Sequence, residues 1–265
     1  MSRIPFSKYH GTGNDFILVD NRKLLWKPAQ EQVARLCDRH FGIGADGLML
    51  LVEKEGSDFG MIYYNSDGRE STLCGNGGRC MTFFAHSLGI IGEKARFSAS
   101  DGVHDSLILS LSGNEATVSI RMNNATVDKL SEGHFFTDTG SPHYVVLSTG
   151  IQSLDVVTEA RKIRYDTCYA EEGTNVDFVE ILPDHLYVRS YERGVEDETL
   201  SCGTGVTASV LAAAYHLGQT EGSFPVRTQG GYLKVRFLRK DTVFSEIWLE
   251  GPAEKVFEGV TEIGD

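Results

Sequence analysis

Short runs of apolar residues along the chain predict a protein rich in β-strands with few helices. The compact runs at 16–19 and 48–52 are typical of buried strands, and the alternation of Phe59, Met61 and Tyr63 predicts another strand. The other predicted strands are 4–8, 95–99, 107–111, 116–120, 144–147, 175–178, 186–191, 233–237, 243–249 and 256–263.

Helical spacing of apolar residues appears in four places. The segments 33–40 and 156–164 predict two short helices. Two more helices are predicted by Cys80, Phe84 and Leu88 and by the similar spacing over 206–217, and both run into a Leu-Gly pair. Because glycine commonly ends a helix, Gly89 and Gly218 are the expected stops.

The last two helices follow a short pattern that occurs twice, Cys74-Gly75-Asn76-Gly77 and Cys202-Gly203-Thr204-Gly205. Other landmarks recur at nearly the same offset, among them Thr12 with Thr139 and Asn65 with Glu192. We therefore predict an α/β protein made by internal duplication, in which two pseudo-symmetric domains each wrap a mixed β-sheet or barrel around one central helix. The predicted domains are residues 1–124 plus about 254–265, and residues 125–253.

Each repeated cysteine is predicted to lie at the N-terminus of a buried helix, and that position has chemical consequences. Helix N-termini carry unpaired N–H groups and a partial positive charge, which stabilise a thiolate and attract anionic ligands. Cys74 and Cys202 are therefore candidate catalytic thiols with lowered pKa values. The competing interpretation is that they are small buried caps, but the duplicated setting favours the functional one.

Composition and charge narrow the classes of function. Among 265 residues, 41% are hydrophobic and 23% charged, and the net charge is −12, which disfavours nucleic acid and anionic membranes as partners. We expect no membrane span and no secretory signal, and five cysteines without such a signal predict reduced thiols in the cytoplasm. The cysteines and histidines lack zinc-site spacing, so we expect no metal. The glycines of 42–47 lie between a predicted helix and a strand, which is the wrong order for a dinucleotide fingerprint.

Several polar residues lie in loops at strand ends, where they either fix turns or bind a ligand. They are Asn14, Asn65, Asn175, the pair Glu192-Arg193, and His143 in the loop equivalent to that of Asn14.

Together these residues resemble the diaminopimelate epimerase family over nearly the whole chain. The resemblance is carried by the segments 9–16, 42–47, 64–68, 74–80, 191–194 and 201–205. It implies two pseudo-symmetric domains with one active site in the cleft between them. It also implies an isomerase that interconverts LL- and meso-2,6-diaminopimelate without pyridoxal phosphate, metal or nucleotide, on the route to lysine and peptidoglycan. Members of the family are cytoplasmic and often dimeric, which implies a cytoplasmic homodimer.

The resemblance also implies roles for individual residues. Cys74 and Cys202 match the catalytic thiols, and His143 and Glu192 match residues that support the chemistry. The matched substrate contacts are Asn14, Asn65, Gly75, Asn76, Asn175, Glu192, Arg193, Gly203 and Thr204. Two positions depart from the family pattern: many members have Asn where this chain has Ser141, and some have Gln where it has Gly47. Both positions concern the distal end of the substrate.

The expected mechanism uses one thiolate to remove the α-proton and the other thiol to protonate the opposite face. The alternative enzyme is a proline or hydroxyproline racemase, a family with paired Cys-Gly motifs that usually carries His where this chain has Asn76. A third alternative is a non-catalytic amino-acid-binding or thiol-redox protein, for which a reversible Cys74–Cys202 disulfide would be useful rather than inactivating.

Overall fold

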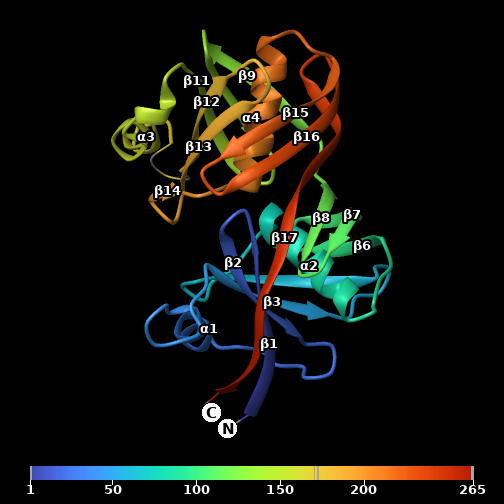
Figure 1. Ribbon diagram of the computed structural model, residues 1–265. Helices are drawn as coiled ribbons and strands as arrows, with labels where there is room; N and C mark the ends of the chain where they lie inside the picture. Colours follow the sequence, from blue (N-terminus) through green and yellow to red (C-terminus); the bar gives the residue numbers. More distant parts are fainter. Residues whose placement is uncertain (1, 170, 172, 264–265) are drawn as a thin grey trace. The chain divides into compact units, whose positions relative to one another are not determined.

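The computed structural model of the chain describes residues 2–169, 171 and 173–263. The chain divides into two compact units, Met1–Ile120 with Gly251–Asp265, and Arg121–Glu250. Each unit is a closed barrel of mostly antiparallel strands that encloses one helix (Figure 1). The predicted fold class, a mixed sheet around a central helix, is confirmed.

In the first unit the strands form a ring in which each pairs with the next. Helix α2 (Gly75–Ser87) is the buried helix of this unit, and α1 (Gln30–Cys37) packs through Val33, Leu36 and Cys37 against a separate apolar cluster. In ring order the strands are β1 (Ser2–Gly11), β2 (Asn14–Asp20), β3 (Gly47–Val52), β4 (Phe59–Asn65), β6 (Lys94–Ala99), β7 (Gly102–Ser112), β8 (Glu115–Arg121) and the second part of β17 (Val243–Ile263); the short β5 (Glu70–Ser71) adds to β4.

The second unit repeats this arrangement around α4 (Gly203–His216). Helix α3 (Val156–Arg164) and the short η1 (Ile151–Ser153) pack against β12 and β13. In ring order the strands are β9 (Ala125–Ser131), β10 (His134–Asp138), β11 (Pro142–Leu147), β12 (Asn175–Ile181), β13 (Leu186–Glu192), β15 (Glu221–Thr228), β16 (Gly231–Lys240) and the first part of β17; β14 (Asp197–Thr199) adds to β13.

The strand register makes the duplication explicit residue by residue. The parallel pair β2–β3 corresponds to β11–β12, and the parallel pair β4–β6 corresponds to β13–β15. Each unit therefore places equivalent residues opposite one another on its strands. The equivalent pairs are Phe16 opposite Gly47 and His143 opposite Asn175, then Met49 opposite Tyr63 and Asp177 opposite Ser190.

Both central helices begin and end where the sequence predicts. Cys74 and Cys202 are the N-cap residues, and Leu88 and Leu217 are the C-caps. The next residues, Gly89 and Gly218, have φ angles of 69° and 68°, the left-handed conformation that glycine adopts without strain.

Five strands, the short β5 and β14 together with β9, β10 and β15, are not predicted by the apolar pattern. The predicted boundary between residues 124 and 125 falls at the start of strand β9, which pairs with β10 and β17. In β9 only Ala125 and Val127 are buried, so the alternation of buried and exposed residues ends at Val127 and is too short to predict a strand.

Candidate active site

The first candidate thiol lies at the start of α2. The Cys74 sulfur accepts a hydrogen bond from the Gly77 N–H at 3.5 Å, and its S–H donates to Asn14 Oδ1 at 3.4 Å. Asn14 is the first residue of β2, so the tight turn between β1 and β2 delivers its amide to the helix terminus. The predicted placement of Cys74 at a helix N-terminus is therefore confirmed.

Groups of fixed polarity set the orientation of the amides beside Cys74. Asp46 Oδ2 accepts from Asn14 Nδ2 at 2.7 Å, so Asn14 Oδ1 faces the thiol. Arg79 Nη2 donates to Asn76 Oδ1 at 2.8 Å, so Asn76 Nδ2 faces Asn14. Arg79 is fully buried, and this burial lowers its pKa to about 10. Its other described acceptors are the Gly75 and Pro252 carbonyls.

The second candidate thiol lies at the start of α4 in a more buried setting. The Cys202 sulfur accepts from the Gly205 N–H at 3.4 Å and lies 3.3 Å from Thr204 Oγ1. Burial raises the pKa of Cys202 well above its ordinary value, and the charges of Glu192 and Asp177 raise it further. The expectation that a helix N-terminus would lower the pKa of this thiol is therefore wrong, because burial outweighs the N–H bond.

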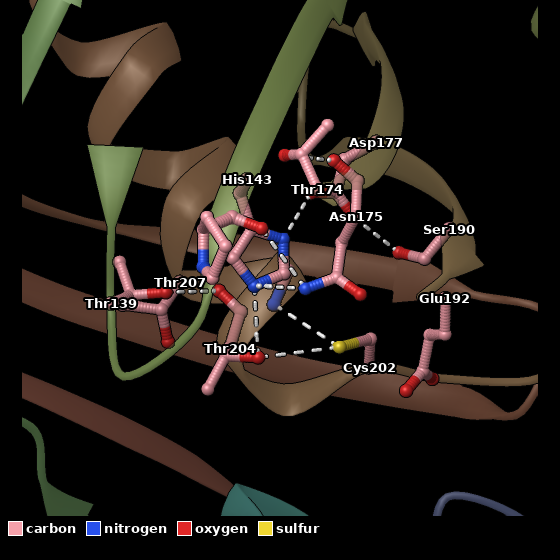
Figure 2. A network of polar contacts seen from close by, with 12 residues as sticks. Thr139, His143, Thr174, Asn175, Asp177, Ser190, Glu192, Cys202, Thr204 and Thr207 are labelled. Carbon is pink, nitrogen blue, oxygen red and sulfur yellow. Dashed lines mark hydrogen bonds and ion pairs between the residues drawn. The ribbon is translucent and has the colours of Figure 1, made fainter. Parts of the chain in front are cut away.

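A buried histidine connects this thiol to the sheet (Figure 2). His143 on β11 has no exposed surface, and its Nδ1 lies 2.7 Å from Asp177 Oδ2. Its Nε2 lies 3.0 Å from Thr204 Oγ1. Ser190 completes the cluster by donating to Asp177 Oδ1 at 2.5 Å.

The other predicted residues of this unit surround the same helix end. Asn175 donates to the Pro142 carbonyl at 3.0 Å and accepts from the Arg193 N–H at 2.9 Å, so its amide fixes two loops. Glu192 ends β13 and accepts from Thr199 Oγ1 at 2.5 Å. The second unit thus gathers His143, Asn175, Glu192, Cys202 and Thr204 around one helix end; Gly203 is the first residue of α4, and Arg193 directly follows β13.

The remaining predicted residues lie in the first unit or at its rim. Gly75 and Asn76 form the first turn of α2. Asn65 ends β4 with an exposed side chain, and its backbone closes the following turn through the N–H of Gly68 at 2.9 Å. A side chain at Gly47 would begin 2.5 Å from both Tyr63 Cε2 and the Tyr64 carbonyl oxygen, so the ring of Tyr63 takes the space that a glutamine would need.

Sequence reasoning did not single out Asp177 or Arg79. Asp177 is two residues from Asn175 on one strand, so period-two alternation places both side chains on the same face of the sheet. That alternation was the available signal. Cys37 and Cys80 are buried, and burial raises the pKa of both thiols.

No cluster of three or more His, Cys, Asp or Glu side chains suited to a metal ion occurs among the described residues. None of the helices in that part of the chain combines the length and apolar character needed to cross a bilayer.

Comparison with known proteins identifies the relatives of this chain. The sequence profile of the diaminopimelate epimerase family matches residues 6–127 and, a second time, residues 135–256. The chain is 46% identical over 253 residues to the diaminopimelate epimerase of Flavobacterium psychrophilum, covering 95% of this chain and 97% of the relative. It is 44% identical to the enzyme of the same name from Chlorobaculum tepidum, with coverages of 94% and 98%.

Solved structures with the same fold are more distant in sequence. A Bacillus anthracis phenazine biosynthesis protein of the PhzF family matches with a TM-score of 0.76 at 16% identity, covering 99% of this chain and 100% of its own. A hydroxyproline epimerase from Agrobacterium vitis, with bound trans-4-hydroxy-L-proline, matches with a TM-score of 0.74 at 15% identity, with coverages of 99% and 93%. These likenesses extend over both units and concern the fold alone.

Proposed function

Since this chain belongs to the diaminopimelate epimerase family, we propose that it is an isomerase that interconverts LL- and meso-2,6-diaminopimelate without a cofactor. The observation that carries the proposal is the pair of cysteines, each the N-cap of the buried helix in one of two equivalent units. Whole-length similarity to relatives of that name supports the choice of substrate. The proposed reaction belongs to lysine and peptidoglycan precursor synthesis, and the proposed location is the cytoplasm.

The proposed mechanism assigns the two proton transfers to Cys74 and Cys202. A thiolate at one residue removes the α-proton, and the thiol at the other protonates the opposite face, with roles exchanged for the reverse reaction. Both thiols must reach one α-carbon, so the proposal requires that both units contribute to one active site. Negative charge that develops on the α-carboxylate is stabilised by the partial positive charge at the starts of α2 and α4.

The remaining roles are proposed from the resemblance to the family and from the position of each residue in the structure. His143 and Glu192 support the chemistry at the second thiol. His143 is linked to Cys202 by hydrogen bonds through Thr204, and the charge of Glu192 raises the pKa of Cys202. Ser141 and Gly47 lie where the distal end of the substrate is held, with Tyr63 filling the space beside Gly47. The proposed substrate contacts are Asn14, Asn65, Gly75, Asn76, Asn175, Glu192, Arg193, Gly203 and Thr204. We propose a homodimer whose partners include neither nucleic acid nor membrane.

The test is a pair of alanine variants with a matched control. Cys74→Ala and Cys202→Ala should each lose epimerisation of diaminopimelate while keeping the circular dichroism spectrum of the parent. Cys168→Ala removes an exposed cysteine outside the helix ends and should keep full activity. Substantial turnover by Cys74→Ala or by Cys202→Ala would contradict the two-base mechanism.

A further inference from the structure

Four buried side chains in the second unit form one continuous chain of hydrogen bonds. Cys202 Sγ lies 3.3 Å from Thr204 Oγ1, which lies 3.0 Å from His143 Nε2, and His143 Nδ1 lies 2.7 Å from Asp177 Oδ2. Cys202 and Thr204 are 8% and 7% exposed, and the other two side chains have no exposed surface. Figure 2 shows the chain running from the helix end to strand β12.

The direction of donation along these hydrogen bonds is set by Asp177 at one end. An ionised carboxylate only accepts hydrogen bonds, so His143 Nδ1 must carry the hydrogen. In the neutral ring Nε2 is then an acceptor, and it takes the hydroxyl hydrogen of Thr204. The Thr204 oxygen is left as an acceptor for the S–H of Cys202. A thiolate at Cys202 would have to compete with His143 for the same hydroxyl hydrogen.

The positions of the first unit that are equivalent to His143 and Asp177 carry apolar side chains instead. Phe16 stands where the second unit has His143, and Met49 stands where it has Asp177. Both Phe16 and Met49 are fully buried, so the barrel folds with apolar side chains at these positions. Burying a carboxylate and an imidazole costs free energy that apolar residues of similar size do not. The polar pair is therefore explained by the adjacent thiol rather than by the fold.

We propose that Asp177 is a positioning residue that fixes the Nδ1–H form of His143 and, through the Thr204 hydroxyl, holds Cys202 as the protonated thiol. The resting protein thus keeps the proton on Cys202, ready to be donated to the substrate. The identity of the substrate that accepts this proton rests on the proposed function, whereas the protonation state of Cys202 does not. The carboxylates whose charges act on Cys202 are Asp177 on β12 and Glu192 on β13, and both raise its pKa in addition to the dominant effect of burial.

The first test measures the ionisation of Cys202 without substrate. The rate of alkylation by iodoacetamide is followed against pH, and the modified peptide is identified by mass spectrometry. In Asp177→Asn, removal of the negative charge should lower the pH midpoint for Cys202 by about one unit. Ser190→Ala is the matched control, because it removes the other hydrogen bond to Asp177 and does not touch His143; its midpoint should equal that of the parent. An unchanged midpoint in Asp177→Asn would overturn the proposal.

The second test needs no Asp177 variant and therefore remains decisive if that variant does not fold. Protein labelled with ¹⁵N in its histidines is studied by NMR near neutral pH, and the signal of His143 is assigned by its absence in His143→Gln. We expect hydrogen on Nδ1 and an unprotonated Nε2. A ring with hydrogen on Nε2 alone would refute the proposal. Neither test requires turnover, so failure to epimerise diaminopimelate would count against the proposed function and leave this inference standing.

Discussion

Alanine at the third residue of each central helix should destabilise the second unit much more than the first. A Cβ at Gly77 would meet the terminal methyl of Met49 at 1.9 Å, whereas a Cβ at Gly205 would meet Asp177 Oδ1 at 2.4 Å and Ser190 Oγ at 3.1 Å. The Met49 methyl can swing away because the side chain is unbranched and flexible. The Asp177 carboxylate is held by two hydrogen bonds, so it moves only if these bonds break.

The magnitude follows from three contributions. Overpacking a buried site costs about 1–3 kcal/mol, and loss of the bond between Asp177 and His143 costs about 1.5–3 kcal/mol because a charged acceptor is involved. Replacing glycine by alanine in a helix returns up to about 1 kcal/mol. Gly205→Ala should therefore lower the free energy of unfolding by about 3 kcal/mol, while Gly77→Ala should change it by less than about 1 kcal/mol.

Thermal unfolding of both variants beside the parent measures the difference. At about 2–4 °C per kcal/mol, Gly205→Ala should unfold about 6–12 °C below the parent, and Gly77→Ala should stay within about 4 °C of it. Equal melting temperatures of the two variants would refute the reasoning. Such a result would mean that the carboxylate of Asp177 moves as freely as the methyl of Met49.

Two further predictions concern ion pairs that are at least partly buried. Arg189 makes two hydrogen bonds of 2.6 Å to Glu198 and also donates to the carbonyls that precede α3, so Arg189→Met should lower the free energy of unfolding, measured in urea, by about 3 kcal/mol. The control is Lys129→Ala at an exposed ion pair, which should change that free energy by less than about 0.5 kcal/mol. Equal effects of the two variants would contradict a stabilising role for the Arg189–Glu198 pair. Burial alone would raise the pKa of Asp15, but hydrogen bonds from Arg39 and a neighbouring lysine lower it to about 2. A carboxyl group whose pKa is lowered by folding stabilises the folded state at pH values above its unfolded pKa, and this stabilisation is lost as the pH falls through the folded pKa. Asp15→Asn should therefore lower the free energy of unfolding by about 2 kcal/mol at pH 7, and the difference from the parent should vanish between about pH 4 and pH 2. A difference that stays constant over that range would show that the ionised carboxylate of Asp15 is not its cause.

The strands that apolar pattern predicts are those with a continuous or alternating buried face. β3 and β12 are buried through their first five residues, and both were predicted. β15 escaped prediction because it contains Gly222 and Pro225 and buries only Val226 and Thr228. Its strand character comes from pairing with β13 and β16, which no local pattern records.

In the candidate site too, features with a local sequence signal could be predicted and features that depend on distant contacts could not. Repetition in the sequence locates Cys74 and Cys202 at helix N-termini, because a Cys-Gly pair before an apolar helix is a local signal. The ionisation of Cys202 was not predictable, because it depends on burial and on carboxylates from two strands. Asp177 was missed for a related reason, since a carboxylate within an apolar strand gains its meaning only from the helix and histidine that it contacts.

The most direct test of the proposed function is hydrogen exchange during turnover. Reduced protein is incubated with LL-diaminopimelate in heavy water, and deuterium at the α-carbon is followed together with optical rotation. The two-thiol account predicts that deuterium enters the α-carbon as the meso isomer forms. Absence of exchange with diaminopimelate would contradict it; exchange with proline or hydroxyproline instead would identify a racemase of that class, and no exchange with any amino acid would leave a binding or redox role.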